Sequence, residues 1–350
     1  MIDEMLSQLS RWLRGDGTDS EIVISCRIRL ARNLSGYPFI TRATETDRRG
    51  IRDSVRRVAD KLWGESGFYF VDVDILSPLD RMFLLERQLI SRELIGSTGT
   101  RAALIDKSES FCVMINEEDH LRIQAMTSGF EPEKIWELVN DIDDKFSASL
   151  PYSFHRQFGY LSTCPTNVGT GMRVSVMLHL PALSVTKEIE KVLRGLQKVH
   201  LTVRGLYGEN SHPVGDLYQI SNQTTLGKTE LELIGTLRNF IPQVLEFERR
   251  SRDFLLHSQR DMILDRCSRA VGLLKTARTI GGVETLHHLS SLRLGVNMGL
   301  IDNITIEEVN RLFLESQAAH LQKITGQKLP TQIERDVARA KFLRTKLGTL

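Results

Sequence analysis

The stretch SCRIRLARNL, residues 25–34, decides how the first part of this chain folds. It follows the mostly apolar run EIVI, and its own apolar residues Ile28 and Leu30 alternate with Arg27 and Arg29. Because successive side chains of a β-strand point to opposite faces, both arginines share one face and both aliphatic side chains share the other. The stretch therefore predicts a strand with one buried apolar face. On its other face, two guanidinium groups point either to a solvated edge or to a strongly anionic ligand.

Composition and charge place the 350-residue chain among globular proteins. It is 41% hydrophobic and 26% charged, and its formal net charge of +2 gives no reason to expect nucleic-acid or membrane binding. The four cysteines lie far apart and form no C-x-x-C pair, which excludes the usual zinc spacings and argues against a disulfide framework. No apolar run approaches the roughly 18 residues that span a bilayer, and the N-terminus has no signal-peptide pattern. We expect a soluble, cytoplasmic protein that binds neither a membrane nor nucleic acid directly.

The pattern of apolar residues changes along the chain, and this change sets the expected domain organisation. Strand-like runs and amphipathic helices alternate at first, and beyond residue 229 almost every segment has the helical period. Strands are expected at 68–75, 101–105, 111–116 and 173–180, and helices at 46–63, 132–147, 187–199, 229–250, 258–278, 284–299, 305–324 and 331–347. We therefore expect an α+β domain, residues 1–256, with a mostly antiparallel sheet flanked by helices, and an all-helical domain, residues 257–350. The second domain is modestly basic, with 14 Lys and Arg against 9 Asp and Glu.

Charged residues gather where the predicted strands end. NEEDHLRIQ (116–124) closes an apolar strand, CPTNVGTGMR (164–173) precedes another, and VRGLYGEN (203–210) is broken by glycines. Each stretch alone is more typical of a solvated rim than of a functional site. His120, which lies among the acidic residues, is expected to be a local hydrogen-bond partner. The stretch LGKT resembles the end of a P-loop, but Asn222 stands where that motif requires glycine, so we reject a P-loop.

Taken together, these stretches predict phosphoryl transfer. Five arginines lie at strand ends or in turns: Arg27, Arg29, Arg122, Arg173 and Arg204. Because a guanidinium stays charged and forks onto phosphate oxygens, converging arginines make a cradle for a polyphosphate. Glu118 and Glu209 remain as carboxylates, and a carboxylate is a bidentate match for a guanidinium. Phosphoryl transfer requires little beyond positioning and charge neutralisation, which this set of residues supplies.

At these residues the chain resembles the phosphagen (guanidino) kinase superfamily. CRIRLARNL, NEEDHLRI, CPTNVGTGMR and ISNQTTLGKTE are similar to its signatures, in its order, over about residues 20–250. The resemblance implies ATP- and Mg²⁺-dependent phosphotransfer to a guanidino group. It implies that the five arginines hold the ATP phosphates and that Glu118 and Glu209 orient the guanidinium, at least one of them as the base. It also implies that Cys164 lies beside the guanidinium nitrogens and that Glu117 touches the magnesium shell through water.

Two departures from the kinases of free creatine or arginine indicate which guanidine is the substrate. The first signature begins at residue 25, which leaves no room for the small N-terminal domain that closes over a free substrate in those enzymes, and a helical extension follows the catalytic part. Met177 also stands where they usually have histidine near the nucleotide. An open site suits a guanidinium carried on a protein, and the arrangement is similar to that of the bacterial protein-arginine kinases. A kinase of a free guanidino metabolite and a non-catalytic phosphoarginine-binding adaptor remain the alternatives.

The resemblance to protein-arginine kinases also implies regulation and partners. The stretch RDVARA puts Arg335 and Arg339 on one helix face, with Asp336 beside them and small Ala340 allowing close approach. Taken alone, this stretch is typical of a solvated basic helix. It is, however, similar to the motif with which these kinases bind phosphoarginine in a regulatory pocket. The resemblance further implies a Clp-type protease or unfoldase, a stress-response repressor and an activator protein as partners. It also implies a homodimer or a higher homo-oligomer.

Overall fold

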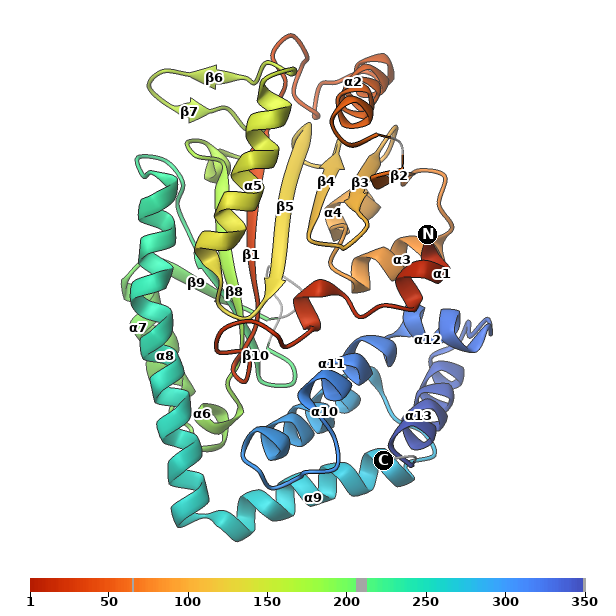
Figure 1. Ribbon diagram of the computed structural model, residues 1–350, viewed down its shortest axis with the longest axis vertical. Helices are drawn as coiled ribbons and strands as arrows, with labels where there is room; N and C mark the ends of the chain where they lie inside the picture. Colours follow the sequence, from red (N-terminus) through yellow and green to blue (C-terminus); the bar gives the residue numbers. More distant parts are fainter. Residues whose placement is uncertain (65, 206–212, 349–350) are drawn as a thin grey trace.

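Residues 1–64, 66–205 and 213–348 are described by the computed structural model of this protein (Figure 1). Within them, eight strands form one sheet in the order β2-β3-β4-β5-β1-β8-β10-β9, and every neighbouring pair is antiparallel. These strands are β1 (Val23–Arg32), β2 (Phe68–Asp72), β3 (Ala102–Asp106), β4 (Phe111–Ile115), β5 (Leu121–Ser128), β8 (Met172–His179), β9 (Leu201–Arg204) and β10 (Leu217–Asn222). A separate hairpin pairs β6 (Phe154–His155) with β7 (Gly159–Tyr160). The expected α+β fold with a mostly antiparallel sheet is confirmed.

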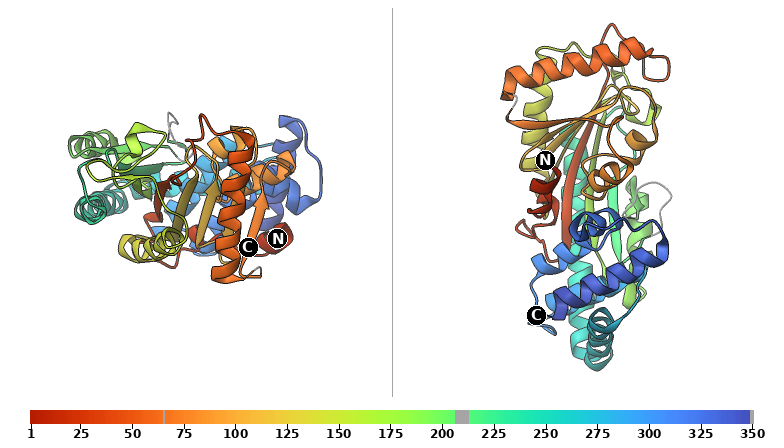
Figure 2. Two further views of the ribbon diagram at one scale, coloured as in Figure 1. Left: turned by 90° about the horizontal axis from the view of Figure 1, so that it is seen from above. Right: turned by 90° about the vertical axis from the view of Figure 1, so that its right-hand side faces the viewer.

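Helices flank the sheet and then make up the rest of the chain. Those before the last strand are α1 (Ile2–Leu6), α2 (Glu45–Trp63), α3 (Pro78–Glu86), α4 (Arg92–Gly96), α5 (Pro132–Ser147), α6 (Pro181–Val185) and α7 (Ile189–Lys198), with short 3₁₀ turns η1 (Arg11–Leu13) and η2 (Pro165–Asn167). Those after it are α8 (Glu230–Ser258), α9 (Arg260–Thr276), α10 (Gly282–Asn297), α11 (Ile306–Glu315), α12 (Ala318–Thr325) and α13 (Gln332–Gly348). Figures 1 and 2 show α9–α13 gathered at the end of the sheet opposite α2. Among the described helices, none combines the length and the apolar character that crossing a membrane requires.

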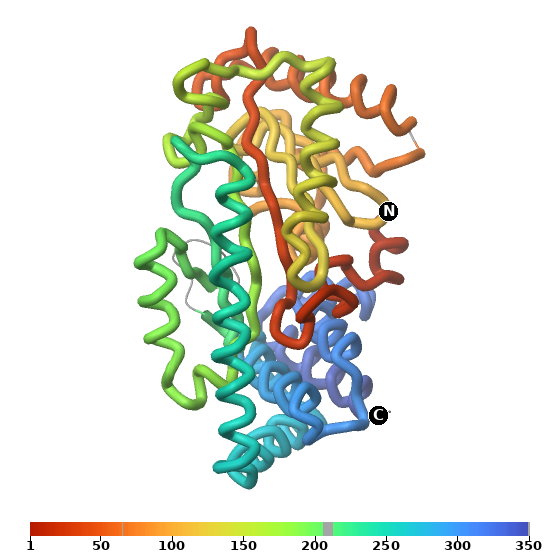
Figure 3. Tube along the Cα trace, turned by 60° about the vertical axis from the view of Figure 1, so that its left-hand side comes forward, coloured from red at the N-terminus to blue at the C-terminus, as the bar shows by residue number. Residues whose placement is uncertain are grey.

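The two faces of the sheet differ in chemistry. On one face, apolar side chains such as Ile28, Ile123 and Val176 are fully buried and pack in one core with α5 and α8. Figures 1 and 3 show both helices crossing that face. Burying one such side chain contributes about 1.5–3 kcal/mol, so this core anchors the strands and decides which way their polar side chains point. The opposite face carries the polar side chains of the same strands.

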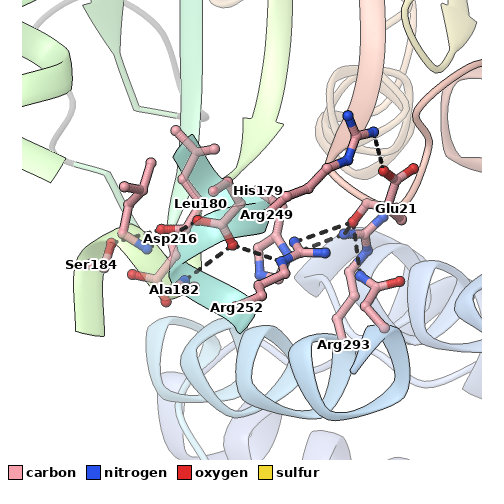
Figure 4. Close-up of polar contacts among 12 residues, drawn as sticks. Glu21, His179, Leu180, Ala182, Ser184, Asp216, Arg249, Arg252 and Arg293 are labelled. Atoms are coloured by element: carbon pink, nitrogen blue, oxygen red, sulfur yellow. Dashed lines mark hydrogen bonds and ion pairs between the residues drawn. The ribbon is translucent and has the colours of Figure 1, made fainter. Parts of the chain in front are cut away.

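Buried polar contacts join the C-terminal helices to the sheet (Figure 4). Arg293 of α10 donates from Nη1 to the backbone carbonyl of Glu21, just before β1, at 2.9 Å. Glu248 of α8 accepts from the backbone N–H of Ala182 at 3.1 Å and from Nε of Arg252 at 2.9 Å. Because a buried polar group without a partner is costly, the Arg293 bond specifies how α10 sits on the segment before β1. The bond between Glu248 and Ala182 specifies how α8 sits on α6.

One expected helix is two helices in the structure. The apolar pattern over 305–324 predicts a single helix, but α11 and α12 stand in its place. Between them Gln317 is extended, with φ −71° and ψ 157°. The break frees the carbonyl of Ser316, which accepts a hydrogen bond from Nε of Arg339 at 2.9 Å. The prediction was wrong because a tertiary contact overrides the local helical period.

Candidate active site

The register of the sheet places four of the predicted arginines on one face. Arg29 of β1 lies directly opposite Arg173 of β8, and on the other side of β1 Ala31 lies opposite Arg122 of β5. Directly opposed residues of antiparallel strands point to the same face, and so do residues two apart on one strand. Together with Arg27, these three arginines project from adjacent strands onto the face opposite α5 and α8. We call this surface the arginine face.

The fifth arginine, Arg204, shares this face but starts further away. It ends β9 and lies opposite Gln219 of β10, which in turn lies opposite Met177 of β8. Met177 is four residues along β8 from Arg173. The backbone of Arg204 is therefore two strands away from that of Arg173 and is shifted from it by about 13 Å along the strand direction. The structure brings four arginines together and puts the fifth at the margin of the group.

The guanidinium groups of the arginine face repel one another. Burial, and next the charges of Arg122 and Arg173, lower the pKa of Arg27 to about 10. Burial, and then the same neighbours together with Arg27, lower the pKa of Arg29 well below its usual value. The buried Nε of Arg29 has no hydrogen-bond partner among the described residues. An anion between these groups would relieve the repulsion, so the face suits a ligand with several negative charges.

Glu117 is the carboxylate built into this face. It is 3% exposed, its Oε2 lies 2.6 Å from Nη1 of Arg122, and the hydroxyl of Ser91 donates to its Oε1. Burial raises the pKa of Glu117, but the charge of Arg122 and these hydrogen bonds outweigh burial, so the pKa lies below its usual value. Within the described residues, no three His, Cys, Asp or Glu side chains gather as a metal cage. A Mg²⁺ ion here would take most of its ligands from phosphate oxygens and water, as it usually does.

Glu118 and Cys164 lie together beside the arginine face. Glu118 and Cys164 are both half-buried, and the Cys164 side chain is near enough to act on the pKa of Glu118, while its sulfur lies 3.1 Å from the hydroxyl oxygen of Thr166. Burial raises the pKa of Glu118, and Arg122 opposes this only in part because the charges of Asp119 and Glu117 raise the pKa further. A carboxylate with a raised pKa is a better proton acceptor at neutral pH than an ordinary one. Glu118 therefore has the environment of a general base.

Asp119 holds the loop that carries Cys164, and the sequence analysis missed this role. Its Oδ1 accepts from Nδ2 of Asn33 at 2.6 Å and from the backbone N–H of Thr163 at 2.7 Å. Its Oδ2 accepts from the hydroxyl of Ser162 at 2.7 Å. Asp119 and Asn33 are only 2% and 1% exposed. Both residues lie inside stretches quoted above, so a polar residue at each of two strand ends was the available signal.

His120 and Arg32, two other residues of the quoted stretches, stabilise the fold through buried polar contacts. Nδ1 of His120 accepts from the backbone N–H of Leu34, and its Nε2 donates to the carbonyl of Pro38, both at 2.9 Å. His120 is a hydrogen-bond partner, as predicted, but its partners are 86 and 82 residues away in the sequence and not local. Arg32, the third arginine of SCRIRLARNL, lies 2.7 Å from Oδ2 of Asp143 on α5 and is 1% exposed. Its charge is therefore paired inside the protein and does not belong to the arginine face.

The Gly-x-Gly turn after Cys164 has a steric reason. Gly171 has φ +63°, and a Cβ there would lie 2.6 Å from the carbonyl oxygen of Ala31. Gly169 has φ +115°, and its Cβ would lie 2.6 Å from the carbonyl oxygen of Thr225. Glycine alone adopts such backbone angles in so little space, so Gly171 is needed for the loop to pack against β1 and Gly169 for it to pack against the segment after β10.

Glu209, the second predicted carboxylate, lies outside the described residues.

The predicted phosphoarginine motif lies on α13. Asp336 is half-buried, and its Oδ1 lies 2.6 Å from Nη1 of Arg339. Arg339 is 4% exposed and donates to two backbone carbonyls at 2.9 Å. Arg335 instead donates to two carbonyls of the turn before α13, and Ala340 is buried. The two arginines share one helix and bond in different directions.

Comparisons with known proteins identify the family of the catalytic part. Residues 50–251 match the family model "ATP:guanido phosphotransferase, C-terminal catalytic domain". The structure is similar to that of lombricine kinase, with a TM-score of 0.59 and 26% identity over 70% of each chain. It is also similar to the duplicated taurocyamine kinase from Schistosoma mansoni with bound transition state analog components, with a TM-score of 0.60 and 27% identity over 71% of this chain and 36% of that one. Fold and site together define a guanidino phosphotransferase.

The full length of the chain narrows the class. Residues 260–350 match the family model "Protein-arginine kinase McsB C-terminal domain". The protein-arginine kinase of Halothermothrix orenii is 41% identical over 346 residues, which cover 99% of each chain. That of Brevibacillus brevis is 41% identical over 345 residues, which cover 98% of this chain and 96% of the relative. The chain belongs to the protein-arginine kinases.

Proposed function

We propose that this protein transfers the γ-phosphoryl group of ATP to the guanidino group of arginine side chains in proteins. The observation that carries the proposal is the position of Glu118 and Cys164 beside the arginine face, in a chain whose relatives are named protein-arginine kinases. The arginines match a triphosphate, and the carboxylate matches a guanidinium.

In this proposal the arginine face binds the nucleotide. The ATP phosphates are held by Arg27, Arg29, Arg122, Arg173 and Arg204. Four of these project from adjacent strands, and their mutual repulsion is relieved when several phosphate oxygens lie among them. Glu117 would hold a Mg²⁺ ion through water, and such an ion would supply charge neutralisation for the transferring phosphoryl group.

Glu118 serves as the base. A guanidinium has a pKa above about 12 and no free lone pair, so it cannot attack phosphorus as it stands. Glu118 accepts its proton while the bond from nitrogen to the γ-phosphorus forms and the bond from that phosphorus to the leaving oxygen of ADP breaks. Cys164, which lies near Glu118, contacts the guanidinium nitrogens. Glu209 supplies a second carboxylate.

The C-terminal part, residues 257–350, is proposed as a regulatory and dimerisation domain next to the catalytic domain, residues 1–256. The helix α8 crosses this boundary and ends at a break at Gln259. Arg335, Asp336, Arg339 and Ala340 bind phosphoarginine there, with the half-buried Asp336 carboxylate facing the guanidinium and the arginines facing the phosphate. The ion pair between Asp336 and Arg339 supports this assignment because it holds the carboxylate in place.

The proposed cellular role follows from the substrate. Phosphorylated proteins are handed to a Clp-type protease or unfoldase, a stress-response repressor is among the substrates, and an activator protein stimulates the kinase. The protein acts in the cytoplasm as a homodimer or a higher homo-oligomer. Family membership supports these statements, and the match of residues 260–350 supports a common role for the C-terminal part.

A paired assay with Mg·ATP tests the proposed function. One reaction contains free L-arginine and the other an unfolded protein that contains arginine, and phosphoarginine is detected by mass spectrometry without acid, which hydrolyses N–P bonds. We expect label on the protein alone. Label on free arginine alone would identify a metabolite kinase, and no label on either would identify a non-catalytic adaptor.

A matched pair of variants tests the proposed base. Glu118→Gln is expected to reduce kcat/KM by roughly 10²–10⁴-fold, as removal of a general base does, and to leave ATP binding intact. Glu133→Gln changes an exposed carboxylate on α5 and is expected to leave both unchanged. Normal turnover by the Glu118 variant would remove Glu118 from the mechanism.

A further inference from the structure

The start of α12 docks onto one buried carboxylate of the catalytic domain. Glu86, the last residue of α3, is 8% exposed. Its Oε1 accepts from the backbone N–H of Ala319 at 2.8 Å, and its Oε2 accepts from the backbone N–H of His320 at 3.0 Å. Nδ1 of the His320 ring lies 2.7 Å from the same Oε2. Three bonds to one carboxylate make this a specific contact between the two parts of the chain.

The next residue, Arg87, is held from several sides. It is 1% exposed, and its Nη2 lies 2.6 Å from Oε1 of Glu109. Its Nη2 also donates to the carbonyl of Gln8 at 3.0 Å, and its own carbonyl accepts from Nε1 of Trp12 at 3.1 Å. With the proton of His320 on Nδ1, the other ring nitrogen accepts from Nη1 of Arg87 at 3.5 Å. Arg87 therefore cannot shift without breaking buried bonds, and it transmits the position of Glu86 to the residue that follows.

That following residue touches the arginine face. Gln88 has φ +61°, a left-handed angle that a residue other than glycine rarely adopts, and this bend turns it toward the sheet. Its Oε1 accepts from Nη1 of Arg27 at 3.3 Å, and its carbonyl accepts from Nε2 of Gln124 at 2.7 Å. Gln88 and Arg27 line the same small hollow with Trp12. Residues 86–88 thus connect α12, through Glu86, to the guanidinium of Arg27, through Gln88.

We propose that Glu86 is a positioning residue for the nucleotide: by docking α12 it holds residues 86–88 so that Gln88 orients Arg27. The inference rests on the proposed role of Arg27 in holding ATP. Its consequence is that ATP affinity depends on how the C-terminal helices sit on the catalytic domain. The contact continues to α13, because the carbonyl of Ser316, two residues before α12, accepts from Arg339. The junction of Figure 4 also joins the two parts, through Arg293 and the carbonyl of Glu21.

The test compares full-length variants by the affinity for Mg²⁺ and the non-hydrolysable analogue β,γ-imido-ATP, measured by calorimetry, together with KM for ATP and kcat. We expect Glu86→Gln and Gln88→Ala each to weaken binding and raise the KM for ATP roughly three- to tenfold, with a smaller change in kcat. The double variant is expected to be no weaker than the weaker single variant, because both changes act through one contact. A purely structural role would lower stability and leave affinity unchanged.

Lys323→Ala is the matched control. Nζ of Lys323 on α12 lies 2.5 Å from Oδ1 of Asp80 on α3, so this pair joins the same two helices without reaching Gln88. Its affinity for the analogue is expected to remain that of the wild type. If Glu86→Gln does not fold, His320→Asn takes its place, since it removes one bond to Glu86 and keeps both backbone bonds.

Two outcomes would overturn the inference: wild-type affinity in the Glu86 and Gln88 variants, or effects that multiply in the double variant. A third variant separates this failure from failure of the proposed function. If Arg27→Met binds the analogue as tightly as wild type, the proposed nucleotide site is wrong. If it binds weakly while Glu86→Gln binds normally, only the positioning role of Glu86 is wrong.

Discussion

Replacing Arg27 by methionine is expected to stabilise the nucleotide-free protein and at the same time to weaken nucleotide binding. Arg27 lies on the arginine face, where burial first and the charges of Arg122 and Arg173 next lower its pKa from the ordinary value of arginine to about 10. Methionine keeps the apolar stem and removes the charge. The substitution therefore separates what the guanidinium does for binding from what it costs in folding.

The size of the effect follows from the pKa. One pKa unit corresponds to about 1.4 kcal/mol, so the folded protein disfavours the charged Arg27 side chain by about 3 kcal/mol relative to the unfolded chain. The penalty is complete below a pH of about 10, where the side chain is charged in both the folded and the unfolded protein. It fades as the pH rises from there toward the ordinary pKa of arginine. Because the side chain keeps part of its exposure to water, we expect a gain of about 1–2 kcal/mol in the free energy of unfolding at neutral pH.

Urea denaturation with and without Mg²⁺ and β,γ-imido-ATP measures both effects. A ligand that binds only the folded state stabilises it in proportion to its affinity, so the variant should gain less from the nucleotide than the wild type. Arg249→Met is the control, because a hydrogen bond from Arg249 to Glu21 raises the pKa of Arg249, and Asp19 adds to this. That variant is expected to lose stability. A lower free energy of unfolding for Arg27→Met without nucleotide, or an unchanged nucleotide effect, would refute this reasoning.

Three further predictions concern the base, the core and the loop. Because burial raises the pKa of Glu118 above 4.5, kcat/KM should fall as the pH decreases through that raised value, and a pH profile with its acid limb at or below 4.5 would contradict this. Asp143→Ala leaves the buried charge of Arg32 unpaired and should lower the free energy of unfolding by about 3–5 kcal/mol in urea, whereas Asp141→Ala in an exposed pair of α5 should cost less than about 0.5 kcal/mol. Gly171→Ala, which adds a Cβ 2.6 Å from a carbonyl oxygen at φ +63°, should cost more than about 1 kcal/mol, and equal stability would show that the turn tolerates a side chain.

The strand β1 shows how much could be predicted from local pattern. Ile28 and Leu30 are fully buried on one face, and Arg27 and Arg29 project from the other, as their alternation predicts. The helix expected over 132–147 has those bounds in the structure. Both predictions succeed because the periods of strands and helices are written into neighbouring residues.

Other features could not be predicted, because their partners are distant in the sequence. The third arginine of the opening stretch, Arg32, pairs with Asp143 and not with a ligand. Asp119 and Asn33, which hold the Cys164 loop, are 86 residues apart. No local pattern distinguishes such a residue from a solvated one, since its burial depends on which strand ends the fold brings together.

By itself, the sequence determined the alternating strand, the succession of mixed and helical parts, and the set of arginines and glutamates that suits phosphoryl transfer. Each of these follows from the order and the charge of nearby residues. Only the tertiary structure decided which arginines share a face and which carboxylate has a raised pKa. It also decided that Glu86 accepts a hydrogen bond from His320 of α12, which is 234 residues away in the sequence. The physical reason is that pairing, burial and repulsion are properties of neighbours in space, and strand register and helix docking choose those neighbours.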